Sequence, residues 1–182
     1  FEDDAPTAGQ TTAALVLDDE GLNGGINGGP GDANGAAIST SGNLVFSAGA
    51  DGLKSIVLSG PATLGSEAVT SSWDAANSTL TISSARGPLV SVVLATPVTG
   101  AYTITLLKPL MHPVSGTEDD ITLNIGYTVT DGDNDSATGS LVVTIDDDTP
   151  TIQAGSLGVS SYVTFLGTDA GYSNSYGYYT KA

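Results

Sequence analysis

Most of the chain consists of short runs in which apolar and polar residues alternate. In the longest of these runs, residues 121–130, every second residue is apolar: Ile121, Leu123, Ile125, Tyr127 and Val129. Because successive side chains of a β-strand point to opposite faces of its sheet, this period predicts strands with one buried face. No stretch keeps the period of an amphipathic helix. The sequence therefore predicts an all-β protein.

Turn-forming residues separate these runs. Asn-Gly, Asp-Gly or Thr-Gly pairs occur at 23–24, 51–52, 99–100 and 131–132. The predicted strands are 13–17, 43–48, 53–59, 79–84, 89–95, 101–107, 121–130, 139–145 and 158–166. Many short strands joined by tight turns are typical of an antiparallel β-sandwich.

The chain is strongly acidic. Twenty Asp and Glu residues oppose four Lys and Arg residues, which gives a formal net charge of −16. Such a chain repels nucleic acid and anionic lipid, and no apolar run approaches the roughly 18–20 residues that span a bilayer. Because 40% of the residues are apolar, the chain can still build a core. Many acids are clustered, and a divalent cation is the simplest way to offset their repulsion.

Cysteine is absent and histidine occurs once, at His112. A secreted domain without disulfides needs another source of stability, and bound Ca²⁺ is a common substitute. One His and no Cys are too few ligands for a structural zinc site, and no Ser lies in a nucleophile-elbow sequence. Carboxylate pairs can serve a glycosidase as acid and base, so a hydrolase is a rival hypothesis. We nevertheless expect that the chain is not an enzyme, because its acids lie in turn clusters suited to metal.

The sharpest motif is Asp131-Gly-Asp-Asn-Asp135. Carboxylates at alternate positions of a tight loop can converge on one hard cation, which takes six to eight oxygen ligands. The loop is not a complete EF-hand, because Ser136 and Val142 stand where that loop has Gly and Glu. We expect Asp131, Asp133 and Asp135 to bind Ca²⁺ with help from elsewhere in the fold. An ordinary solvated hairpin turn is the alternative.

Other acids are candidates for the missing ligands. Asp146–Asp148 follow one strand later, and Asp3 and Asp4 lie at the other end of the first domain. A second acidic corner, Asp18-Asp19-Glu20, follows the predicted strand 13–17. It either completes a Ca²⁺ site at the same pole or is a plain turn. Glu118–Asp120 is expected to be a solvated turn, and Asp51 is expected to be a single turn acid with no metal role. The predicted metal ligands are Asp131, Asp133, Asp135, Asp147, Asp148, Asp3, Asp4, Asp18, Asp19 and Glu20.

A junction sequence occurs twice. Residues 1–7 read Phe-Glu-Asp-Asp-Ala-Pro-Thr, and residues 145–151 read Ile-Asp-Asp-Asp-Thr-Pro-Thr. A junction repeated at both ends of a domain indicates a tandem array, and the start at Phe1 predicts a piece of a longer chain. We therefore predict a β-sandwich over residues 1–149. Residues 150–182 are predicted to be a linker and the hairpin-like start of a further, incomplete domain.

The tail is rich in tyrosine, with five of the seven Tyr residues between Tyr162 and Tyr179. These rings either belong to the core of the following domain, line a peptide or sugar site, or dock the tail onto the first domain or another chain.

Several motifs, taken in order, resemble the long repeat domain of giant RTX adhesins, which Gram-negative bacteria secrete through the type I system. The resemblance covers residues 1–150 and rests on Leu17-Asp-Asp-Glu-Gly-Leu22, Gly28-Gly-Pro-Gly-Asp32, Leu44-Val-Phe-Ser47, Gly49-Ala-Asp-Gly52, Trp73-Asp-Ala-Ala76, Thr99-Gly-Ala-Tyr-Thr103, Leu110-Met-His-Pro113, Gly126-Tyr-Thr-Val-Thr-Asp-Gly-Asp133 and Asp147-Asp-Thr-Pro150. It implies an immunoglobulin-like or cadherin-like Greek-key sandwich. It also implies Ca²⁺ ligands at Asp131, Asp133, Asp135, Asp147 and Asp148, although Asn134 stands where many such loops carry Gly.

The same resemblance implies a place and a role. The chain is expected to be an extracellular, monomeric extender module of a bacterial cell-surface adhesin that supports adhesion and biofilm formation. Its partners are then the neighbouring domains of the same chain, joined through Ca²⁺. The alternative is a module of the same adhesin that binds host or surface glycans or peptides through the tyrosine-rich segment. Ice binding, a third role of such adhesins, is not expected, because no flat array of Thr is evident.

Overall fold

The computed structural model describes residues 4–23, 37–113 and 119–146 of the chain. The chain divides into two units, residues 1–150 and 151–182. All of the second unit lies outside the described residues, and with it the predicted strand 158–166 and the tyrosine-rich segment.

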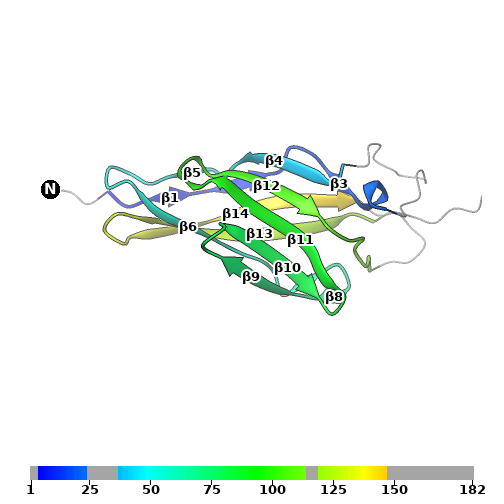
Figure 1. Cartoon of the computed structure of the whole chain (residues 1–182). Coiled ribbons are helices and arrows are strands. Elements are labelled where there is room, and N and C mark those ends of the chain that lie inside the picture. The colour runs from blue at the N-terminus through cyan, green and yellow to red at the C-terminus, as the bar shows by residue number, and fades with distance from the viewer. Residues whose placement is uncertain (1–3, 24–36, 114–118, 147–182) are drawn as a thin grey trace, which may run out of the picture. The chain divides into compact units, whose positions relative to one another are not determined.

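The first unit is an all-β sandwich of two main sheets (Figure 1). One sheet has the strand order β4-β12-β11-β10-β9, and the other has the order β2-β14-β13-β6 with β3 attached to β14. The small pairs β1-β5 and β7-β8 complete it. The strands are β1 (Thr7–Ala8), β2 (Gln10–Thr12), β3 (Leu17–Asp18), β4 (Ser39–Asn43), β5 (Phe46–Ser47), β6 (Leu53–Ser59), β7 (Thr63–Leu64), β8 (Glu67–Ala68), β9 (Thr70–Asp74), β10 (Thr79–Ser84), β11 (Gly87–Thr96), β12 (Ala101–Leu106), β13 (Ile121–Asp131) and β14 (Ser136–Asp146). Two short 3₁₀ helices are η1 (Asp19–Gly21) and η2 (Pro97–Thr99).

The predicted sandwich is confirmed, with one difference in its pairing. Most neighbours are antiparallel, but β2 and β3 run parallel to β14. The predicted strand 13–17 is wrong, because the structure forms β2 before this stretch and β3 at its end. The predicted strand 43–48 is also wrong, because the pairing residues belong to β4 and β5. The Greek-key connection stays a prediction.

The core lies between the two sheets. The alternating residues of β13 all point inward, and none is more than 5% exposed: Ile121, Leu123, Ile125, Tyr127 and Val129. They meet inward residues of the other sheet such as Leu80, Val92 and Ile104, which are equally buried. Period-two patterning therefore sets which face of each strand is covered.

The outward faces of the sheets carry hydroxyl groups. On the first sheet, strand pairing places five of them in one row across the strands: Ser39, Thr105, Ser91, Thr81 and Ser72. On the second sheet, the outward residues of β13 from Thr122 to Thr130 include no charged residue. Charge is thus concentrated toward the ends of the strands.

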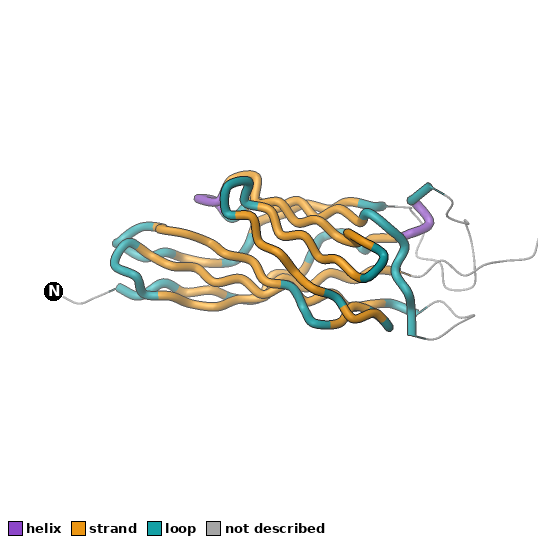
Figure 2. Tube along the Cα trace, turned by 60° about the horizontal axis from the view of Figure 1, so that its bottom comes forward, coloured by secondary structure: helices purple, strands orange, loops and turns teal. Residues whose placement is uncertain are grey.

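Strands β13 and β14 define the two ends of the unit. At one end, the β13–β14 turn lies beside the β5–β6 turn and near Asp4, and we call this end the turn pole (Figure 2). At the other end are Asp18, Asp120 and Asp146, and we call it the exit pole. Ten residue steps along β14, from Ser136 to Asp146, correspond to about 33 Å.

Candidate metal centre

The β13–β14 turn is held by its first acid. Asp131 ends β13, and its Oδ1 atom accepts a hydrogen bond of 2.8 Å from the backbone N–H of Asp135. The backbone N–H of Asp131 donates to the carbonyl oxygen of Asp135 over 3.1 Å. Asn134 adopts a positive φ of 89°, which lets the chain reverse within the turn. The turn therefore presents Asp131, Asp133 and Asp135 from one closely bonded loop.

The β5–β6 turn packs directly against this loop. Because Leu53 pairs with Asp131, Asp51 stands next to the β13–β14 turn. A Cβ atom at Gly132 would lie only 2.4 Å from the carbonyl oxygen of Asp51. Glycine at position 132 therefore permits an approach of the two turns that any larger residue would block.

Three carboxylates from the two turns meet at the turn pole. One carboxylate oxygen from each of Asp51, Asp131 and Asp133 lies within 4.8 Å of the other two. Two oxygens bound to one Ca²⁺ can be at most twice the metal–oxygen distance apart, which is about 4.8 Å for a bond of about 2.4 Å. The three side chains could therefore hold one ion between them. Their mutual repulsion also favours a cation there.

Asp131 provides the observation that separates this cluster from an ordinary acidic turn. The residue is 0% exposed, whereas Asp51 and Asp133 are exposed. Its Oδ2 atom is buried and has no hydrogen-bond partner. Because an unsatisfied buried carboxylate oxygen is costly, such an atom indicates a missing ligand. Carboxylate oxygens alone suit a hard cation such as Ca²⁺ or Mg²⁺ and not a soft one.

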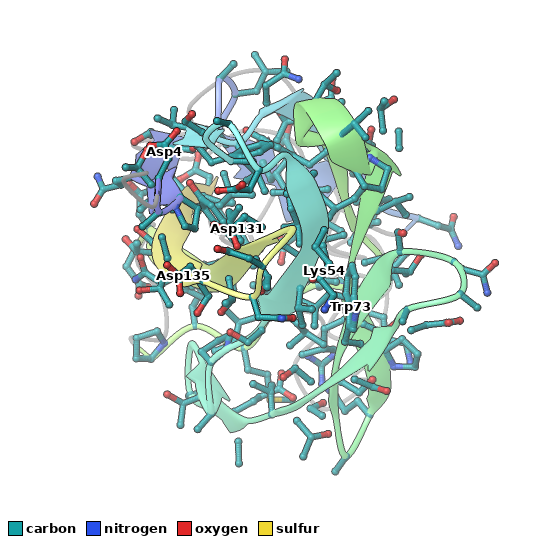
Figure 3. The ribbon with its side chains drawn as sticks, turned by 90° about the vertical axis from the view of Figure 1, so that its left-hand side faces the viewer. Asp4, Lys54, Trp73, Asp131 and Asp135 are labelled. Carbon is teal, nitrogen blue, oxygen red and sulfur yellow. The ribbon has the colours of Figure 1, made fainter. Side chains whose placement is uncertain are left out.

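Asp4 and Asp135 lie at the same end but outside the group of three. The Oδ2 atom of Asp4 accepts a hydrogen bond of 2.8 Å from the backbone N–H of Ala50, the residue before Asp51. Asp135 is half-buried within the β13–β14 turn. Figure 3 looks onto this end of the unit and labels Asp4, Asp131 and Asp135 there, together with Lys54 of β6.

The acidic corner Asp18-Asp19-Glu20, in β3 and η1, lies at the exit pole and not at the turn pole. Asp18 pairs with Asp146 of β14, and both are buried. The Oδ1 atom of Asp18 accepts from the backbone N–H of Glu20 over 2.9 Å and caps η1. The Oδ2 atom of Asp19 accepts from the backbone N–H of Leu110 over 3.0 Å. Within one unit these acids cannot share a cation with Asp131.

The expectation that Asp146 helps to complete the Asp131 site is therefore wrong for a single unit. Asp146 instead contacts Asp120, and the hydrogen bond between the two carboxyl groups raises the pKa of Asp120, with burial and the charge of Asp146 adding to the rise. Of the expected solvated turn Glu118–Asp120, Glu118 lies outside the described residues, Asp119 is half-buried and Asp120 is exposed. The predicted ligands Asp3, Asp147 and Asp148 lie outside the described residues.

Sequence reasoning missed Asp51. The available signal was its dipeptide, because Asp51-Gly52 repeats the Asp131-Gly132 pair. Nothing in the sequence joins the two turns, since their contact follows from the β6–β13 register.

No match to this chain is found among protein-family models, curated proteins or solved structures. Among the described residues, no helix has the length and apolar character needed to cross a membrane.

Proposed function

We propose that this chain is a Ca²⁺-binding structural module of an extracellular bacterial surface adhesin, and that it has no catalytic role. The observation that carries the proposal is Asp131, whose Oδ2 atom is buried and unsatisfied and whose carboxylate has an oxygen within 4.8 Å of carboxylate oxygens of Asp51 and Asp133. The resemblance to the repeat domains of RTX adhesins gives the cellular setting.

The distribution of charge supports a structural role. Most acids of the described residues lie at the turn pole or the exit pole, while the outward residues of the two sheets carry mainly hydroxyl groups. Asp4, near the start of the unit, lies at the turn pole, and Asp146, near its end, lies at the exit pole. In a tandem array, the exit pole of one unit would therefore precede the turn pole of the next. Shared ions at such junctions would stiffen the array.

The proposed site suits extracellular calcium. Two of its three carboxylates are exposed, which leaves part of the coordination sphere to water or to a neighbouring unit. Sites of this kind in extracellular modules bind Ca²⁺ at about 10⁻⁴–10⁻³ M. Low cytosolic Ca²⁺ would then leave the site empty until the chain is exported, and binding would be coupled to folding outside the cell.

Thermal melting of the whole chain tests the proposal. We expect about 10 mM Ca²⁺ to raise the Tm over that in EDTA by about 4–10 °C, because a ligand at 10–100 times its Kd adds about 1.4–2.7 kcal/mol to the folded state. Mg²⁺ at the same concentration should give a smaller shift, since it demands a tighter and more regular geometry. A Tm that does not respond to Ca²⁺ contradicts the proposal.

The tyrosine-rich segment, on which the ligand-binding alternative depends, lies outside the described residues. A glycan or peptide array separates the two roles, because a structural module gives no hits.

A further inference from the structure

Lys54 is a cation placed at the acidic turn pole. It is the second residue of β6 and is exposed, and its ammonium group donates a hydrogen bond to the Oδ1 atom of Asn134. Asn134 lies between Asp133 and Asp135 in the β13–β14 turn. The ammonium group is therefore held at the turn that supplies Asp131 and Asp133 to the carboxylate cluster.

The other cations of the described residues are engaged elsewhere. Arg86 forms an ion pair with Glu67 and donates to the carbonyl oxygen of Pro109. Lys108 donates to the carbonyl oxygen of Arg86. Among the described residues, Lys54 is thus the cationic side chain that contacts the β13–β14 turn.

Asn134 has a conformation that glycine would adopt more easily. Its φ of 89° lies in the left-handed region, which side chains other than that of glycine rarely adopt. The hydrogen bond to Lys54 gives the asparagine side chain a function that glycine could not fulfil. The side chain of Asn134 therefore holds the ammonium group of Lys54 at the β13–β14 turn.

We propose that Lys54, held in place by Asn134, weakens and tunes the binding of a divalent cation at Asp51, Asp131 and Asp133. This inference rests on the proposed function. Without a divalent cation, the ammonium group offsets part of the repulsion among the carboxylates. When Ca²⁺ binds, the ammonium group repels it, because like charges at the same pole raise the free energy of the bound state.

The expected change in Kd can be estimated from Coulomb's law. A single charge and a divalent ion separated by about 8 Å in water interact by an amount worth about a fivefold change in Kd. At about 0.5 M salt the Debye length falls to a few ångströms, so the effect should shrink below about twofold. A change in Kd that depends on salt in this way distinguishes charge tuning from a loss of structure.

The test is calorimetric titration of the full chain with CaCl₂ at about 10 mM ionic strength, where screening is weak. Lys54→Gln is expected to lower Kd by about threefold to sixfold. Lys108→Gln removes the same charge elsewhere and is expected to change Kd by less than about twofold. Asn134→Gly frees the lysine and is expected to lower Kd by less than Lys54→Gln does. A melting curve of each variant shows that it is folded.

The outcomes separate the two proposals. If the wild-type chain takes up no Ca²⁺, the proposed function fails, and the tuning role fails with it. If the wild-type chain binds Ca²⁺ but Lys54→Gln binds it no more tightly, only the tuning role is overturned. Equal gains from Lys54→Gln and Lys108→Gln also overturn it, because net charge then explains the change. A weaker affinity in Asn134→Gly does the same, because Asn134 would then support the site directly.

Discussion

At the scale of single residues, Asp131 combines two tasks. Its Oδ1 atom closes the β13–β14 turn through the N–H of Asp135, and its Oδ2 atom is buried without a hydrogen-bond partner. The first task needs only an acceptor, which an amide also supplies. The second needs a negative charge if a cation is bound. A substitution that keeps the acceptor and removes the charge therefore separates the turn from the site.

Asp131→Asn should abolish the rise of Tm on adding Ca²⁺. Its amide oxygen can still accept the hydrogen bond of 2.8 Å from Asp135, so the variant should fold. Asp74→Asn is the matched control, because Asp74 is an exposed acid that accepts hydrogen bonds from Ala76 and Asn77 in a different turn. Differential scanning calorimetry with and without Ca²⁺ measures both. A full calcium response in Asp131→Asn would contradict the assignment.

Gly132→Ala should lower stability by about 1–3 kcal/mol, as overpacking does. The added Cβ would lie 2.4 Å from the carbonyl oxygen of Asp51 and would push the two turns apart. Ca²⁺ affinity should fall as well, because Asp51 moves away from the cluster. Gly52→Ala is the comparison, since its φ of 76° strains alanine while no atom lies within 4 Å of the new Cβ. Equal calcium affinities in the two variants would argue against close contact between the turns.

At the scale of strands and turns, one ion pair connects two hairpins. Arg86, in the β10–β11 turn, donates to Glu67 of β8 and to the carbonyl oxygen of Pro109. The hydrogen bond from Arg86 lowers the pKa of Glu67 below the ordinary value of 4.5 for a glutamate. The pair therefore stabilises the fold above that pH, and this contribution is lost as the pH falls through the lowered pKa.

Glu67→Gln should therefore destabilise the fold at pH 7 by about 0.5–1 kcal/mol, a typical value for a partly exposed pair. The difference from the wild type should vanish at low pH, where Glu67 is protonated in the wild type too. Urea unfolding at neutral and acidic pH measures it. A deficit that stays constant with pH would mean that the contribution is packing and not charge.

Strands with strict alternation could be predicted from the sequence, and edge strands could not. The run at 121–130 carries an inward apolar residue at every second position, the strands at 53–59 and 79–84 each bury two apolar residues spaced two apart, and all three form as expected. Strand β9 reads Thr-Ser-Ser-Trp-Asp and is mostly exposed at the edge of its sheet. Because an edge strand with little burial needs no apolar alternation, its sequence gives no such signal.

Two of the three acids of the candidate site could be predicted from the sequence, and the third could not. Asp131 and Asp133 belong to one local motif, which the sequence displays. Asp51 joins them only because β6 pairs with β13 in a register that places Leu53 opposite Asp131. Registers between distant strands depend on the whole packed sandwich and not on local residues. The same limit leaves the position of Asp18, Asp19 and Glu20 open in the sequence, and the structure places them at the exit pole.

At the scale of the whole molecule, the net charge of −16 is expected to lower the stability of the fold at low salt. Without divalent cations, the acids at each pole repel one another, and salt screens this repulsion. Raising NaCl from about 10 mM to about 0.5 M should therefore raise the Tm in EDTA, because the Debye length falls from about 30 Å to a few ångströms. The same salt change in saturating Ca²⁺ should have less effect. A Tm in EDTA that falls with added NaCl would contradict this picture.

The parallel pairing of β2 and β3 with β14 has a mechanical consequence. These strands belong to the beginning and the end of the unit, and they lie side by side with their chain directions aligned. Pulling the unit apart by its two ends would slide β14 along β2 and β3, so their hydrogen bonds would be loaded together in shear and would not open one after another. A module attached at both ends would thus resist stretching along the direction in which tension would reach it.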